Sequence, residues 1–314
     1  MESMPENRLL KLPLGAIDNI RKIHDLDTPG RLEEALKILQ DWILKQDHII
    51  KKDFSEEYLE KSLLSCKGSV EKAKKQIDRL CTMKTMIPKY FSKTNNYSFS
   101  CLSVQNISCR WLVPLPIITE DYYRVLMVKI SNKNLTAENL MQYYQYSITE
   151  YIKAHDYVNG FIIIDDFSQM NLFDLMTKIS VIELQQFISI LVEGYGARLK
   201  SIHVLTDSKG IELLIKTIKQ FVSEKIGDRI QVQTTLEDLH KVVPKEILPV
   251  EYGGSERSLV KLQADWVEEL SSDKSVEYIK MMQKACTDET KRTEGKFNEE
   301  YMGMPGSFRC LSVD

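Results

Sequence analysis

A few residues have the types and spacing that a catalytic or metal site would need. Cys286 and Arg292 have the Cys-x5-Arg spacing in which a thiolate attacks a phosphate ester held by an arginine. The intervening residues, TDETK, contain no glycine to form an anion-cradling loop, so we interpret the spacing as chance. Asp165 and Asp166 end an apolar run and have the chemistry of acid/base or metal-binding carboxylates. For Asp166 we favour the structural alternative, a cap on the following turn.

No set of residues assembles a nucleophile, a base and an oxyanion site. The histidines are scattered, at positions 24, 48, 155, 203 and 240. His203 lies inside an apolar run, where we expect a hydrogen-bonded imidazole of the core or of a pocket wall. A P-loop, GxSxG and HExxH are absent, and Gly194-Tyr195-Gly196 is only a fragment of a dinucleotide fingerprint. We therefore expect no enzyme activity, no catalytic residues, no metal and no cofactor.

The composition narrows the class of protein. The chain has 314 residues, and its 42 basic and 45 acidic side chains give a net charge of −3. This balance excludes a strongly basic nucleic-acid binder. Six cysteines show neither a CxxC pair nor a metal-ligand spacing, which is typical of reduced thiols. We find neither a secretory signal nor a membrane-spanning apolar run, and together with the cysteines read as reduced thiols this leads us to expect a cytoplasmic location.

Apolar periodicity divides the chain into a helical part and an α/β part. In the first 95 residues, helices are expected after Gly30, at Ser55 and at Ser69, the last ending at Pro88. Beyond them, the expected strands are 110–115, 125–130, 160–165, 199–205 and 230–233, with helices near 136–151, 180–191 and 208–226. This alternation predicts an α/β fold with a mainly parallel sheet. After Gly254 we expect one helix at 258–271 and then a mobile or wrapping tail.

Several segments together resemble the CRAL-TRIO lipid-transfer family. The most specific is LPVEYGG (248–254), which stands where that family has a nearly identical closing motif. The others are SLLSCKGSVEKAKKQIDRLCTMKTMIPKYF, NGFIIIDDF and ARLKSIHVLTDSKGIELLIKTIKQFVSEKI. The resemblance implies a helical N-terminal domain over 1–95, a CRAL-TRIO lipid-binding domain over 96–255 and a C-terminal helix and tail over 256–314. In the lipid-binding domain, helices that include a movable gate helix flank the sheet.

The function that the resemblance implies is non-catalytic. It is the intracellular binding and transfer of a small hydrophobic ligand, such as a tocopherol, retinoid or carotenoid, with release at phosphoinositide-containing membranes. The alternative is a membrane-trafficking adaptor that reads phosphoinositides and whose pocket holds a phospholipid. In either case we expect a monomer that is cytoplasmic and peripheral to membranes, with no nucleic-acid partner.

Pocket and gate residues follow from the positions that match the family. The expected pocket wall consists of Leu140, Tyr143, Ser147, Phe161, Ile163, Asp165, Phe187, Ile190, Leu191, Leu199 and Ile202. The gate helix carries Ile211, Leu214, Ile215, Ile218 and Phe221. For the apolar members the alternative is plain core packing. Asp165 differs because a buried carboxylate is costly unless it is paired, so we expect it to meet a ligand hydroxyl, Ser147 or a tyrosine. We therefore hypothesise a ligand with a polar end.

The resemblance also implies a phosphoinositide headgroup site at Arg198, Lys200, Lys225 and Arg229. The alternative is a solvated charge pattern, because Glu224 and Asp228 are interleaved with the basic residues. Leu64 and Cys66 depart from the family, whose N-terminal domain usually supplies arginines there. Lys67 is the candidate substitute.

Overall fold

The computed structural model describes residues 7–91, 110–130, 138–172, 181–220 and 222–293. Its helical N-terminal part contains α1 (Ala16–Ile23), α2 (Arg31–Lys45), α3 (Glu56–Ser65), α4 (Val70–Met86) and the 3-10 turn η1 (Pro88–Tyr90). Within the described part of the chain, no helix is both long and apolar enough to cross a membrane.

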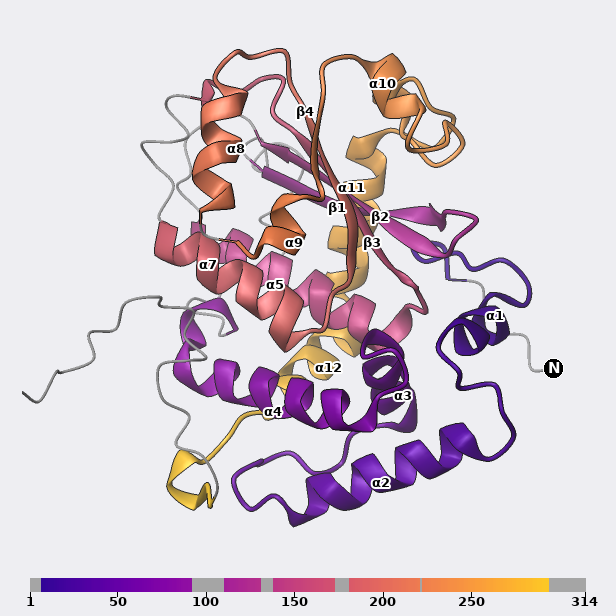
Figure 1. Cartoon of the computed structure of the whole chain (residues 1–314), viewed down its shortest axis with the longest axis vertical. Coiled ribbons are helices and arrows are strands. Elements are labelled where there is room, and N and C mark those ends of the chain that lie inside the picture. Colours follow the sequence, from indigo (N-terminus) through magenta and orange to yellow (C-terminus); the bar gives the residue numbers. More distant parts are fainter. Residues whose placement is uncertain (1–6, 92–109, 131–137, 173–180, 221, 294–314) are drawn as a thin grey trace, which may run out of the picture.

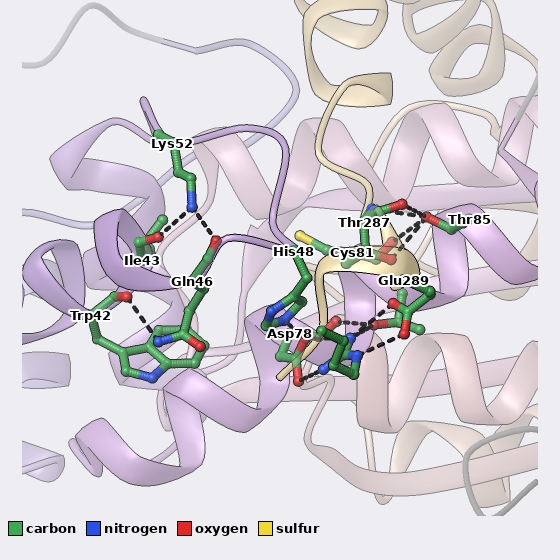
Figure 2. Close-up of polar contacts among 12 residues, drawn as sticks. Trp42, Ile43, Gln46, His48, Lys52, Asp78, Cys81, Thr85, Thr287 and Glu289 are labelled. Atoms are coloured by element: carbon green, nitrogen blue, oxygen red, sulfur yellow. Dashed lines mark hydrogen bonds and ion pairs between the residues drawn. The ribbon is translucent and has the colours of Figure 1, made fainter. Parts of the chain in front are cut away.

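Local signals in the sequence fix the helix ends of this part. The Ser55 hydroxyl accepts a hydrogen bond from Tyr58 N at 3.2 Å and so caps the start of α3, as the sequence predicts. At the C-terminal end of α2, Lys52 Nζ donates to Ile43 O at 2.9 Å and also to Gln46 O (Figure 2). An ammonium beside the last carbonyls complements the negative end of the helix dipole.

A single five-stranded sheet forms the other part, with the order β1-β2-β3-β4-β5. Its strands are β1 (Arg110–Ile118), β2 (Tyr123–Ile130), β3 (Gly160–Asp166), β4 (Leu199–Leu205) and β5 (Ile230–Gln233). β1 and β2 pair antiparallel, and every other pair is parallel. The predicted bounds of β4 and β5 are confirmed, and the prediction of a mainly parallel sheet is confirmed as well.

Helices cover the sheet from several sides (Figure 1). α8 (Ile211–Lys219) and α9 (Glu224–Gly227) lie on one side of β4, and α10 (Leu236–His240) and α11 (Leu259–Ser271) lie on the other. Below the sheet, α5 (Glu138–His155) and α7 (Val181–Ser189) separate it from α3 and α4. The remaining elements are short turns, η3 (Ile190–Gly194), η4 (Val250–Tyr252) and η5 (Glu289–Lys291), and helix α12 (Asp273–Gln283).

The prediction of one helix over 208–226 is wrong. α8 ends at Lys219, and α9 starts only at Glu224, after Ser223. Ser223 has an extended backbone (φ −62°, ψ 148°), which a continuous helix cannot accommodate. The apolar stripe therefore predicts α8 correctly, but the helix does not continue through Ser223 into α9. Phe221 lies outside the described residues.

The segment after Gly254 packs against both parts of the molecule. α11 was predicted, but α12 was not, although its buried residues Ile279 and Met282 are three positions apart, as on one face of a helix. Residues 284–293, which we name the C-terminal strap, continue from α12 onto the N-terminal helices. Ile50 N donates to Cys286 O at 3.0 Å, and Asp288 N donates to His48 O at 2.7 Å. Of the two alternatives that the sequence left open, a mobile or a wrapping tail, these residues show the second.

An ion-pair network closes the strap (Figure 2). Both terminal nitrogens of Arg292 contact the Asp78 carboxylate, at 2.9 and 3.0 Å. His48 Nε2 lies 2.8 Å from Oδ1 of the same carboxylate. Nearby, Thr287 N donates to the Thr85 hydroxyl at 2.8 Å. Bidentate contacts of this kind define orientation as well as distance, so the strap has one register on α4.

Candidate ligand-binding site

The central strand β3 has one buried face and one partly exposed face. Along the strand burial alternates, so that Ile162, Ile164 and Asp166 are buried while Phe161, Ile163 and Asp165 are not. β3 is paired on both sides, by β2 and β4, so the exposure does not come from a free edge. It means that, among the residues the structure describes, nothing fully covers this face. An apolar strand in the middle of a sheet is normally covered on both faces.

Neighbouring strands extend the partly exposed face. In register with Ile163 are Leu126 of β2 and Ile202 of β4, and both are also only partly buried. Asp165 is opposite Val128, which is partly buried too. We call Leu126, Val128, Phe161, Ile163, Asp165 and Ile202 the open face of the sheet. Three predicted strand residues, Phe161, Ile163 and Asp165, therefore share one face with Ile202, as expected.

Helix α8 packs at the edge of the open face. Ile211 and Leu214 are buried in a small apolar cluster with Val204 of β4, and Ile215 and Ile218 pack against that cluster. This cluster is separate from the main core of the sheet. The described gate residues thus turn towards the sheet, whereas Leu213 on the outer side of α8 is 51% exposed.

Helix α7 is anchored to the N-terminal helices along one side. Lys89 pairs with Glu183 at 3.1 Å, and the Tyr90 hydroxyl donates to Gln186 Oε1 at 3.1 Å. In η3, which follows α7, Arg79 pairs with Glu193 at 2.7 Å. α7 is followed by a π turn, a rare helix type that is frequent at functional sites. The N-terminal helices therefore position α7.

The other predicted pocket residues divide into three groups. On α7 and η3, Phe187 and Leu191 are partly buried, and Ile190 is buried in the main core. Ser147 on α5 and Leu199 on β4 are buried. Leu140 and Tyr143 lie in α5, but their side chains are outside the described residues. Which of these residues line a ligand pocket stays a prediction.

On the buried face, Asp166 is a structural carboxylate. Its Oδ1 accepts from Ser168 N at 2.9 Å and from Ser168 Oγ at 2.6 Å, which confirms the predicted cap on the following turn. Oδ2 accepts from the Tyr252 hydroxyl at 2.7 Å. His203, on the same face, is buried between Ser201 Oγ at 2.8 Å and Gln233 Nε2 at 3.1 Å. The prediction of a hydrogen-bonded core imidazole is confirmed.

The closing motif, residues 248–254, is built for close packing. A Cβ on Gly254 would stand 1.9 Å from Leu248 O, so only glycine fits there. Both oxygens of the Glu251 carboxylate lie 3.0 Å from Leu259 N, at the positive end of α11. His240 Nε2 lies 2.7 Å from Tyr252 O. The motif thereby joins the end of the sheet to α10 and α11.

Three of the four predicted headgroup residues meet at the start of β4. The pairing register shifts between Phe161 and Ile162, so that Lys200 bulges out and is exposed beside the buried Leu199. Arg229 Nη1 donates to Leu199 O, which places its guanidinium next to Arg198 and Lys200. Lys225 is exposed on α9, one helical turn before Arg229. Of the two departures from the family, Leu64 and Cys66 are both buried, so neither side chain faces solvent.

Arg198 is held by groups that the sequence did not single out. Its Nη2 donates to His24 Nε2 at 2.8 Å, to Asn159 Oδ1 at 2.6 Å and to Asn159 O. Burial, together with the nearby Arg198 charge, lowers the pKa of His24 to about 4, so the imidazole is neutral at pH 7. His24 comes from the loop after α1, so this contact joins the N-terminal helices to the sheet.

Comparisons with known proteins agree with this geometry. A family model described as a CRAL/TRIO domain matches residues 120–254, which include β2 to β5 and the closing motif. These residues belong to the CRAL/TRIO domain family. A second model, described as a Pinta-like UBA domain, matches residues 28–100.

Individual relatives match over shorter stretches. The protein named alpha-tocopherol transfer protein-like from Homo sapiens is 31% identical over 123 residues, which are 35% of this chain and 36% of that protein. Clavesin-2 from Rattus norvegicus is 35% identical over 98 residues, which are 31% of this chain and 30% of that protein. The chain thus matches about a third of the length of these relatives. A solved structure titled "Crystal structure of Sfh5" aligns with 80% of this chain and 99% of that chain at a TM-score of 0.48 and 13% identity.

The phosphatase-like spacing does not form a site. The Arg292 guanidinium is committed to Asp78 and Glu289, and the Cys286 thiol donates to Lys284 O at 3.5 Å. Burial raises the pKa of the Cys286 thiol, which disfavours the thiolate. The interpretation of Cys-x5-Arg as chance is therefore supported by the contacts of both residues.

A buried polar cluster between the CRAL/TRIO domain and the N-terminal helices escaped the sequence analysis. Lys84 pairs with Glu150 at 3.0 Å, and the Tyr195 hydroxyl donates to the same carboxylate oxygen at 2.7 Å. Lys153 is buried one turn later on α5, and its Nζ has no hydrogen-bond partner among the described residues. Burial lowers the pKa of Lys153 to about 8. Such lysines look like surface residues in the sequence, because only the domain contact buries them.

Proposed function

We propose that this chain binds a small lipophile against the open face of the sheet and transfers it between membranes. The observation that carries the proposal is the partial exposure of Phe161, Ile163 and Asp165 in the centre of the sheet. Leaving apolar side chains exposed there costs about 25 cal/mol per Å² of area that a ligand could cover. Pockets for small molecules are typically apolar with few polar groups, which describes this face.

The ligand that fits this face is apolar with one polar end. Asp165 is the polar residue among the six that form the open face, and the residues in register with it are apolar. A single carboxylate can orient a ligand hydroxyl but cannot distinguish related lipophiles. Relatives of this chain are named for a tocopherol, a phenol with one hydroxyl and an isoprenoid tail, and that chemistry suits this arrangement.

The lipids bound by matched variants test whether Asp165 holds the polar end of the ligand. We would purify the native chain, Asp165→Asn and Asp165→Leu, extract each with organic solvent and identify the lipids by mass spectrometry. We expect Asp165→Asn to keep the hydroxylated ligand, because an amide also accepts a hydrogen bond, and Asp165→Leu to lose it. An unchanged profile in Asp165→Leu would refute the role of Asp165.

We further propose that release takes place at phosphoinositide-containing membranes. Arg198, Lys200 and Arg229 lie together, and within the described chain none of them has an acidic side chain at ion-pair distance. Each basic residue near an anionic membrane surface contributes about 1 kcal/mol. Exchanging Lys225 and Arg229 for glutamate should abolish binding to phosphoinositide vesicles. Lys280→Glu, on the exposed side of α12, is the matched control, and retained binding in the double variant would reject the assignment.

The same basic residues favour a second candidate function, a membrane adaptor that reads phosphoinositides. In that case recruitment to vesicles would not depend on a lipophile. Protein stripped of lipid would bind phosphoinositide vesicles as tightly as loaded protein, and extraction of native protein would yield no lipophile or a phospholipid. A carrier would instead yield a stoichiometric small lipophile.

A further inference from the structure

Among the described residues, no acidic side chain pairs with Arg198. Elsewhere in the molecule, arginines with little exposure are paired with carboxylates: Arg21 contacts Glu60 at 2.7 Å, and Arg124 contacts Asp156 at 2.8 Å. Within the described part of the chain, Arg198 has no such partner, and its contacts are the neutral His24 and Asn159. Burial lowers the pKa of Arg198, which reflects the cost of an unpaired charge away from water. An anion is the partner that would remove this cost.

The contacts of Arg198 leave two of its guanidinium nitrogens without a short hydrogen bond to a described residue. All the short hydrogen bonds come from Nη2, and Nη1 lies only within 3.5 Å of His24 Nδ1. The Nε group donates to no described residue. Each of these two nitrogens can donate a charge-assisted hydrogen bond to an oxygen of an anion. The guanidinium is therefore held in place through Nη2 and keeps donors for an anionic ligand.

The position of His24 depends on close backbone packing. A Cβ on Gly68 would stand 2.6 Å from His24 O, so the turn between α3 and α4 holds the loop that carries His24. Likewise, a Cβ on Gly160 would stand 2.4 Å from Arg198 O. The imidazole and the guanidinium thus come from two parts of the molecule that are each packed tightly at this point. A rigid neutral acceptor can orient a cation without cancelling its charge.

We propose that His24 is a positioning residue that preorganises Arg198 to bind a phosphate group. The inference rests on the proposed headgroup site and assigns to the N-terminal helices a part in it. The exposed Lys200, on the bulge next to Arg198, supplies a second cation for the same group. Preorganisation raises affinity because the side chain does not lose its rotamer freedom on binding.

Two variants at position 24 test the proposal. His24→Leu removes the acceptor, and His24→Gln restores a neutral acceptor. We expect His24→Leu to bind vesicles that contain phosphatidylinositol bisphosphate about fivefold more weakly, because one neutral hydrogen bond is worth about 1 kcal/mol. His24→Gln should return to within about twofold of the native affinity, a rescue that a purely structural role would not produce. Soluble inositol trisphosphate, measured in parallel, separates recognition of the phosphate from recognition of the membrane.

The outcomes separate this inference from the proposed function. If the native chain binds neither vesicles nor inositol trisphosphate, the headgroup site itself is wrong. If the native chain binds but His24→Leu binds equally well or more tightly, the positioning role of His24 is wrong and the site stands. If His24→Leu does not fold, a lower affinity of Asn159→Leu supports the preorganisation of Arg198, and an unchanged affinity overturns it.

Discussion

The Tyr252 hydroxyl donates a 2.7 Å hydrogen bond to Oδ2 of Asp166, and so joins the closing motif to the end of the central strand. Lys129 lies 3.4 Å from the same oxygen, so the carboxylate is balanced by a cation and a hydroxyl. Burial and the Asp166 charge raise the pKa of Tyr252, so the phenol keeps its proton. Asp165 and Asp166 are adjacent in sequence, but they have opposite surroundings because strand residues alternate between faces.

Removing this hydroxyl should destabilise the fold without affecting the open face. We expect Tyr252→Phe to lower the free energy of unfolding by about 1–2 kcal/mol, the value of a hydrogen bond to a charged group. Urea unfolding followed by fluorescence measures it. Tyr278→Phe is the control, because that hydroxyl bonds no described residue. Equal stabilities of the two variants would contradict the structural role of Tyr252.

The buried Lys153 should make the protein less stable at neutral pH than at high pH. Its folded pKa of about 8 is below the ordinary value of 10.5, so the folded state releases the proton first. Stability therefore rises between pH 8 and 10.5, and the cost of the buried charge is fully present at pH 7. We expect Lys153→Met to raise the free energy of unfolding at pH 7 by about 2 kcal/mol.

Urea unfolding of native protein and Lys153→Met at pH 7 and at pH 10 tests this prediction. The difference between the two proteins should shrink at the higher pH. Lys280→Met, at an exposed position of α12, should change little at either pH. A Lys153→Met variant that is less stable than the native chain at pH 7 would show that Lys153 has a partner in solution.

The buried His24 should make the protein lose stability at acidic pH. Its pKa of about 4 is below the ordinary value of 6.5, because of burial and the Arg198 charge, with Lys67 acting in the same direction and Asp25 against it. Stability is then present above pH 6.5 and is lost as the pH falls through about 4. We expect His24→Gln to lose about 2 kcal/mol less between pH 6.5 and 4 than the native chain. Identical pH profiles would contradict a buried neutral imidazole.

The C-terminal strap should hold the N-terminal helices in place through Arg292. Removing the buried guanidinium leaves His48 as the remaining partner of the Asp78 carboxylate, and losing one partner of a buried ion pair costs up to about 3 kcal/mol. We therefore expect Arg292→Ala to lower stability and to increase hydrogen exchange in α4 and in the strap. Lys291→Ala is the matched control, because its ion pair with Asp288 is largely exposed and contributes little. Native exchange rates in Arg292→Ala would show that the strap does not need this contact.

Elements with a local signal were predicted well from the sequence. The apolar runs defined β4 and β5 to the residue, and the serines before α3 and α4 marked their first turns. The alternation of residues along β3 is enough to place Phe161, Ile163 and Asp165 on one face, without knowledge of which strands pair with β3. Asp166 and His203 were assigned to structural roles because isolated polar groups next to apolar runs usually have neighbours that satisfy them.

Features that depend on tertiary contacts could not be predicted. The break between α8 and α9 depends on Ser223, whose type also suits a helix surface. Lys153 and Arg292 look like ordinary surface cations until the domain contact and the strap bury them. His24 gave no signal at all, because the group that it contacts, Arg198, is far away in the sequence. Contacts between residues so far apart in the sequence become visible only in the folded structure.

The open face of the sheet is tested most directly by native mass spectrometry of the chain and of Ile163→Trp. Ile163 lies in the middle of that face, so an indole there would occupy the space of a ligand. We predict that native protein carries one small lipophile per chain and that folded Ile163→Trp carries none. Ile182→Trp, at an exposed position of α7, should keep the native occupancy. A native chain without a lipophile, or a folded Ile163→Trp that retains it, would contradict lipid binding on this face.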